Sequence, residues 1–150
     1  MSANTVFSPF EKMECFSLNH PVITCQEAAS AKGIPLHNEL KSLIINTSKG
    51  LCVLHIPGNK KANLRSIKKA IKADEACLAG EAALEMLQVK AGTVTPFLKQ
   101  IWDLPQFISN EVLLNDFVST NAGVRDKYII FDPKMLMAHT NIMIGCFHRS

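Results

Sequence analysis

The sequence predicts an α/β protein whose strands form a sheet or barrel with mixed or antiparallel pairing. Helical and strand-like stretches alternate along the chain, the strand-like stretches are short, and Gly, Pro and Asn separate them at short intervals. Short strands joined by tight turns favour hairpins over the long crossovers of a doubly wound nucleotide-binding fold.

The first elements are a short helix and a hairpin. Residues 24–27, T-C-Q-E, form a capping box, and Gly33 supplies a stop, so we expect a helix over residues 24–33. Residues 38–46 and 51–56 are apolar runs on either side of a polar turn, which indicates a β-hairpin.

Two helices are expected next. Apolar residues at i, i+3 and i+7 predict a helix over residues 63–72, with Asn63 as its cap. Alanine and leucine predict a second helix over residues 81–88.

The last part of the chain is expected to be mostly strands. Short apolar runs at residues 107–108, 112–114, 117–118 and 128–131 are typical of strands. An Asp-Pro pair after the last run then predicts the start of a helix.

The composition is typical of one globular domain, which we place over residues 1–150. Of the residues, 47% are hydrophobic and 19% are charged, and no apolar run reaches the ~18 residues of a membrane span. No secretory signal is recognised at the N-terminus. Five cysteines without a C-x-x-C pair favour a reducing compartment, so we expect a cytoplasmic protein. The net charge of +3 permits a polyanionic partner without requiring one.

Familiar catalytic and cofactor motifs are missing. The sequence has no Gly-rich phosphate loop, no H-E-x-x-H and no G-x-S-x-G. Cys146 and His148 are two residues apart, but a buried thiol beside an exposed imidazole explains them better than a metal pair. We therefore expect no metal and no cofactor.

Three segments do indicate a ligand site. Gly92 and Pro96 bracket a stiff bend whose amides could line a floor for a carbonyl or an oxyanion, although an ordinary connector fits too. Lys41 shares a strand face with core residues, so its ammonium needs an anionic or carbonyl partner unless it reaches water. The small polar run at 119–123 suits either a pocket wall or a plain turn.

In this order the motifs resemble the YbaK/ProX family of aminoacyl-tRNA deacylases, which includes the editing domain of bacterial prolyl-tRNA synthetase. The resemblance runs from about residue 20 to residue 136. It rests on H-P-V-I-T at 20–24 before E-A-A at 27–29, L-K-S-L at 40–43, V-L-H-I-P-G at 53–58, G-T-V-T-P-F at 92–97 and T-N-A-G at 120–123.

The resemblance implies a largely antiparallel, barrel-like sheet surrounded by helices. It implies metal-independent hydrolysis of the ester that joins a wrong amino acid to tRNA, assisted by the terminal ribose hydroxyl. Lys41 would hold the substrate, and the loop from Gly92 to Pro96 would place the scissile carbonyl, which makes these three the expected catalytic residues. The expected substrate-binding residues are His20, Thr93, Val94, Thr95, Phe97, Asn121, Ala122 and Gly123.

The sequence departs from the family pattern at two places. Phe97 is followed by Leu98 and Lys99 where the family often has Gly-Leu, and Ser42 follows the lysine where some alanine-editing relatives have Asn. The identity of the amino acid and of the tRNA therefore stays open.

A basic strip is a candidate tRNA-binding surface. Its members lie on one flank of the predicted 63–72 helix and just before it, although a solvated amphipathic face would look the same. The strip consists of Lys60, Lys61, Arg65, Lys68, Lys69 and Lys72.

Three classes of function follow. The first is a free-standing trans-editing deacylase that releases Ala, Ser, Cys or Thr from a mischarged tRNA, with tRNA-Pro the expected carrier. The second is a noncatalytic module of the same fold that binds tRNA or an aminoacyl-tRNA synthetase. The third is a small-molecule enzyme or structural domain unrelated to tRNA. No membrane or DNA partner is expected.

Overall fold

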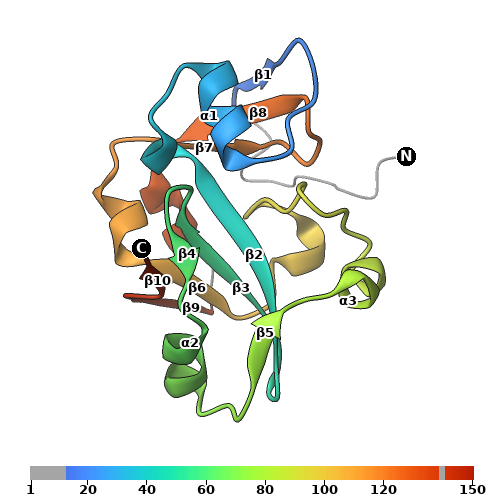
Figure 1. Cartoon of the computed structure of the whole chain (residues 1–150), viewed down its shortest axis with the longest axis vertical. Helices are drawn as coiled ribbons and strands as arrows, with labels where there is room; N and C mark the ends of the chain where they lie inside the picture. The colour runs from blue at the N-terminus through green and yellow to red at the C-terminus, as the bar shows by residue number, and fades with distance from the viewer. Residues whose placement is uncertain (1–12, 139–140) are drawn as a thin grey trace.

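The largest sheet has five strands in the order β5-β2-β3-β6-β9 (Figure 1). The computed structural model describes residues 13–138 and 141–150. The predicted hairpin is confirmed: β2 (Leu40–Thr47) and β3 (Gly50–Pro57) pair antiparallel along their whole length. β5 (Ala76–Leu78) adds antiparallel to β2, whereas β6 (Gln106–Ser109) and β9 (Ile142–Gly145) add in parallel.

Two small antiparallel sheets complete the strands. β8 (Lys127–Phe131) lies between β1 (Cys15–Ser17) and β7 (Val118–Asn121), and β4 (Lys61–Ala62) pairs with β10 (His148–Arg149). The pairing is thus mixed and largely antiparallel, as predicted. The expected barrel-like closure is not found, because the described strands form three separate sheets.

The three predicted helices before residue 90 are confirmed as α1 (Cys25–Lys32), α2 (Leu64–Ile71) and α3 (Glu81–Met86). The Thr24 hydroxyl accepts the amide of Glu27 at 3.1 Å, and Gly33 ends α1 with φ 70°. Asn63 caps α2 by accepting the amide of Ser66 at 3.2 Å.

One predicted strand is wrong. Residues 112–114 lie in the 3-10 helix η4 (Asn110–Leu114), where Val112 enters the core and Leu114 is 81% exposed. A short apolar run can serve either element, and here only part of it is buried. The helix predicted after Asp132 is confirmed, and it is a 3-10 helix, η5 (Pro133–Ala138). The remaining 3-10 helices are η2 (Leu36–Asn38) and η3 (Lys99–Ile101).

The core lies on both faces of the β2–β3 hairpin. Ile45 packs on one face in a cluster with Ile67 of α2, and Ile44 packs on the other in a cluster with Val94 and Leu98. Side chains of successive strand residues point to opposite faces, which explains this division. No helix of the described residues is long and apolar enough to cross a membrane.

Candidate functional site

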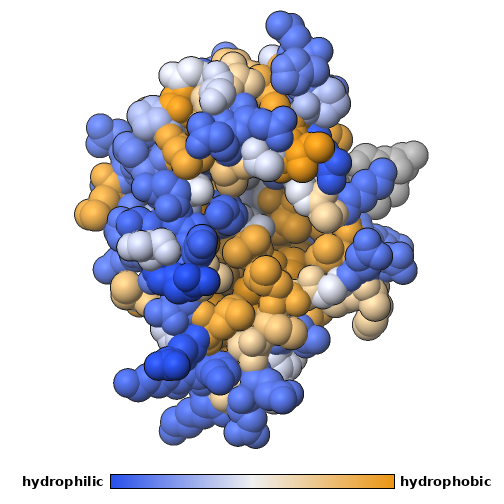
Figure 2. All heavy atoms as spheres, viewed as in Figure 1, coloured by the Kyte–Doolittle hydropathy of each residue, from blue (hydrophilic) through white to orange (hydrophobic). Residues whose placement is uncertain are grey.

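A cavity of about 470 Å³ lies along the open edge of β2. On this edge β5 pairs only with residues 45–47, so the first half of β2 has no such cover. Residues 40–43 all line the cavity, and consecutive residues with alternating side chains can do so only at a strand edge. Figure 2 shows this face hollowed near β2, with apolar side chains in the hollow.

The structure brings the predicted lysine and the predicted bend to this one cavity. Lys41, Gly92 and Val94 all contribute to its wall, together with Asn121 from β7. The Lys41 ammonium donates to the backbone carbonyl of Lys60 at 2.9 Å. The expectation that this half-buried ammonium needs a carbonyl or anionic partner is therefore met by a carbonyl.

Asn121 and Arg125 hold the bend at 92–94 in place. Asn121 Nδ2 donates to the Val94 carbonyl at 3.0 Å, and its Oδ1 accepts the amide of Gly123 at 2.8 Å. Arg125 donates to the Ala91 carbonyl at 2.6 Å. Gly92 has φ +80°, and a Cβ there would lie 3.2 Å from Arg125 Nε. The positive φ therefore favours glycine, and a Cβ would also press on the Arg125 side chain.

Several predicted site residues lie outside the cavity wall. Thr93, Thr95, Pro96 and Phe97 are buried behind the bend, and Phe97 packs edge-to-face on Phe131. Their position suits support of the bend. His20 is exposed and bonds to the carbonyl of Pro21, while Ala122 and Gly123 follow Asn121 at the end of β7. The roles of these residues in substrate binding stay predictions.

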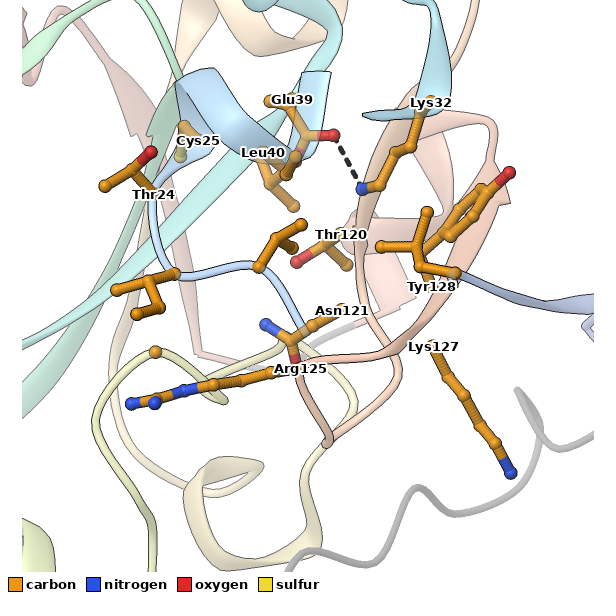
Figure 3. Close-up of a pocket in the computed structure, with 15 residues that line it drawn as sticks. Thr24, Cys25, Lys32, Glu39, Leu40, Thr120, Asn121, Arg125, Lys127 and Tyr128 are labelled. Atoms are coloured by element: carbon orange, nitrogen blue, oxygen red, sulfur yellow. Dashed lines mark hydrogen bonds and ion pairs between the residues drawn. The ribbon is translucent and has the colours of Figure 1, made fainter. Parts of the chain in front are cut away.

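A smaller recess of about 70 Å³ adjoins the cavity and shares Thr24, Cys25 and Asn121 with it. Figure 3 shows an ion pair at one side of this recess, and Asn121 and Arg125 at the other. The pair is Lys32–Glu39, with 2.6 Å between Nζ and Oε1.

The Lys32–Glu39 pair was not predicted from the sequence. Both side chains are almost fully buried, and Lys32 also donates to Ser119 Oγ at 2.9 Å and lies 4.7 Å from the ring centre of Tyr128. The two residues are seven positions apart, and they meet only because the chain reverses at Gly33. No spacing rule for helices or strands indicates such a pair.

Burial dominates the electrostatics of this recess. It raises the pKa of the Glu39 carboxyl and lowers the pKa of the Lys32 ammonium, and in each case the partner's charge offsets only part of the effect. Burial also raises the pKa of the Cys25 thiol, although the nearby Lys41 ammonium acts in the opposite direction. No three His, Cys, Asp or Glu side chains among residues 13–138 and 141–150 gather as a metal site.

The basic strip lies beside the cavity lysine. Lys60 and Lys61 lead through β4 into α2, and hydrophilic side chains cover this part of the surface in Figure 2. Arg149 of β10 was not predicted, but it lies next to Arg65 in a shallow groove and donates to the Ala62 carbonyl at 3.3 Å. Pairing of β10 with β4 brings Arg149 here, and no local pattern indicates it.

Fold and site together define a small α/β protein with a lysine at a strand-edge cavity and cations on the adjoining surface. The family model of the aminoacyl-tRNA editing domain matches residues 19–138, so the chain belongs to this family. The resemblance inferred from the sequence motifs is thereby confirmed. No curated protein sequence matches the chain.

Two solved structures share the fold. One, described as a "putative trans-editing enzyme for prolyl tRNA synthetase", is 22% identical with a TM-score of 0.82, over 95% of this chain and 90% of that one. The other, the hypothetical protein APE2540, is 22% identical with a TM-score of 0.81, over 92% of each chain. At this level of identity the likeness establishes the fold alone.

Proposed function

We propose that this protein is a trans-editing deacylase that hydrolyses the ester between a small, wrongly attached amino acid and the 3′ end of a tRNA. The observation that carries the proposal is the shared cavity of Lys41, Gly92 and Asn121, with the small recess opening beside it. The editing-domain family supplies the class of reaction, and the name of one structural neighbour favours tRNA-Pro as the carrier.

The size of the recess supports a small amino acid. The recess is small, about 70 Å³ against about 470 Å³ for the adjoining cavity. A small side chain, from the methyl of Ala to the 1-hydroxyethyl of Thr, suits this space better than an aromatic ring. The cavity of about 470 Å³ outside it would hold the terminal adenosine.

The proposed mechanism relies on positioning and charge. An aminoacyl ester is already reactive, so holding its carbonyl beside hydrogen-bond donors provides much of the required acceleration. Lys41 would supply a positive charge to the substrate, and the bend from Gly92 would set the position of the carbonyl carbon. Water adds to that carbon, the bond to the ribose oxygen breaks, and that oxygen takes a proton. The neighbouring ribose hydroxyl would assist the water.

The basic strip would contact tRNA phosphates. It begins at Lys60, whose backbone carbonyl accepts a hydrogen bond from the Lys41 ammonium. The basic strip and the cavity are therefore joined at this segment. Phosphate contacts position a nucleic acid without reading its sequence. Selection would therefore depend on the cavity and on the acceptor end.

A noncatalytic tRNA- or synthetase-binding module of the same fold is the second candidate. The observation that favours it is that the Lys41 ammonium already donates to a backbone carbonyl. Such a protein would bind mischarged tRNA, or the synthetase, and leave the ester intact.

Hydrolysis of a panel of aminoacyl-tRNAs, with one tRNA body and varied amino acids, tests the proposal. We expect release of Ala, Ser, Cys or Thr but not of large amino acids, first on tRNA-Pro. Tight binding without release across the whole panel would favour the noncatalytic module. Absence of both binding and release would contradict the deacylase and the tRNA-binding module, and would leave only a module that binds the synthetase.

A further inference from the structure

A chain of hydrogen bonds leads from the cavity into the core. Ser42 lines the cavity, and its Oγ lies 2.8 Å from Nδ1 of His55, which is 0% exposed. Nε2 of His55 lies 2.7 Å from Oε1 of Gln106. Gln106 Nε2 in turn donates to the backbone carbonyls of Ile101 and Leu104, at 2.9 and 3.0 Å.

With a neutral His55 ring, the hydrogen bonds of this chain have one consistent direction. Two carbonyl oxygens accept from Gln106, so its nitrogen must face them and its oxygen must face His55. That oxygen can only accept, so Nε2 of His55 carries the proton. Nδ1 of the neutral ring is then an acceptor, and the Ser42 hydroxyl donates to it. The Ser42 hydrogen therefore points at His55, and its lone pairs are left for the cavity.

The same chain argues against Ser42 as a nucleophile. In serine hydrolases a carboxylate stabilises the imidazolium that forms when histidine takes the serine proton. Here the third group is the uncharged amide of Gln106, and His55 is fully buried. Gln106 supplies no counter-charge to a charged ring in that position, and burial of a charge is strongly unfavourable.

We propose that His55 and Gln106 are positioning residues that make Ser42 a hydrogen-bond acceptor for the aminoacyl end of the substrate. This inference rests on the proposed function. The aminoacyl end offers two donors, the α-ammonium group and the terminal ribose hydroxyl. Ser42 follows Lys41, which is a donor only, and the two side chains leave β2 on opposite faces, so the cavity edge presents a cation on one side of the strand and an acceptor on the other. An amino ester, with a carbonyl and an ammonium, matches this pair.

Two substitutions at position 55 separate positioning from structure. His55→Asn keeps a polar group where Nδ1 lies and can still accept from Ser42, whereas His55→Gln reaches Gln106 but removes that acceptor. We expect His55→Asn to keep deacylation within about threefold, and His55→Gln to lose about tenfold or more, the value of one directed hydrogen bond. Ser42→Ala should lose as much deacylation activity as His55→Gln. Ser42→Thr keeps the hydroxyl and should retain activity. A purely structural His55 would instead make activity follow thermal stability in both variants.

The tautomer of His55 gives a test that does not depend on turnover. Nitrogen chemical shifts in ¹⁵N-histidine-labelled protein should show a neutral ring protonated on Nε2, and Ser42→Ala should shift the Nδ1 resonance. A ring protonated on Nδ1 would overturn the inference whatever the enzymatic activity.

Binding of uncleavable analogues identifies the donor. We would use alanine joined by an amide to 3′-amino-3′-deoxyadenosine, and versions that lack either the α-amino group or the ribose 2′-hydroxyl. Ser42→Ala should weaken binding of the parent about tenfold and have no effect on the version without the relevant donor. Equal binding of every analogue to both proteins would overturn the inference. A wild-type protein that binds these analogues but hydrolyses no ester would refute the proposed function and leave the Ser42 assignment standing.

Discussion

The ammonium of Lys41 donates a hydrogen bond to the backbone carbonyl of Lys60, with 2.9 Å between the two atoms. This bond joins the edge of β2 to the segment that leads into β4 and α2, so the cavity and the basic strip are mechanically connected. A side-chain substitution at Lys60 leaves the carbonyl in place. Charge on the strip and charge in the cavity can therefore be altered separately.

Replacement of Lys41 tests the cavity assignment. Lys41→Met keeps the aliphatic stem and removes the charge, so the fold should be retained while deacylation falls. One donor directed at developing negative charge contributes about 3 kcal/mol, which corresponds to roughly a hundredfold loss in rate. Single-turnover deacylation of alanyl-tRNA-Pro measures it, with Lys134→Met, which removes a lysine outside the cavity and the strip, as the matched control. A folded Lys41→Met protein with undiminished activity would remove Lys41 from the mechanism.

The basic strip can be tested through salt dependence. Each phosphate contact that is lost should lower the slope of log Kd against log salt by about 1. Lys69→Gln in α2 should show this change, whereas Lys134→Gln in η5 removes the same charge outside the strip and should not. Filter binding of tRNA from 50 to 200 mM salt gives both slopes. Identical slopes in the two variants would place the tRNA elsewhere.

The bend at Gly92 can be tested against a second glycine. Gly92 and Gly33 both have positive φ, +80° and +70°, so Ala should strain each backbone by about 1–2 kcal/mol. Only at Gly92 would the new Cβ press on a side chain, that of Arg125, while Gly33 has open space. We expect Gly92→Ala and Gly33→Ala to lower Tm similarly, and Gly92→Ala alone to reduce deacylation. If Gly92→Ala deacylated as fast as Gly33→Ala, the pressure of the new Cβ on Arg125 would not disturb the site.

Elements with a clear local pattern were predictable, whereas several strands without one, which depend on distant pairing, were not. The capping box at Thr24 and the apolar spacing of α2 act within one or two helical turns, so they determine those helices locally. Strands β9 and β10 form because they pair with β6 and β4, which lie far away along the chain. The sequence of the run at 112–114 fits a strand or a 3-10 helix equally well. In the fold only Val112 of this run is fully buried, and the run forms a 3-10 helix.

The candidate site shows the same division. Lys41 and Gly92 belong to short motifs that can be recognised in the sequence. His55 and Gln106 are 51 positions apart, and a buried histidine within an apolar strand gives no indication of its partner. Groups such as His55 and Gln106, which lie behind the cavity wall, could therefore be identified only from the three-dimensional structure.

We expect removal of one partner of the Lys32–Glu39 pair to destabilise the fold more than replacement of both partners by apolar residues. Lys32→Met or Glu39→Leu alone leaves one charge buried without its partner, which costs about 3–5 kcal/mol. The double variant removes both charges and should be less destabilised than the sum of the two. Urea unfolding of the four proteins gives the coupling. Additive losses would show that the two side chains do not interact.

The pH dependence of stability tests the raised pKa of Glu39. Because burial raises this pKa above its ordinary value of 4.5, the folded protein holds a proton that the unfolded chain has already released. The contribution to stability is complete below pH 4.5 and is lost as the pH rises through the folded pKa. The advantage of wild type over Glu39→Gln, measured by urea unfolding from pH 4 to 8, should therefore shrink as the pH rises. An advantage that grows over this range would mean that attraction to Lys32 outweighs burial and lowers the pKa of Glu39.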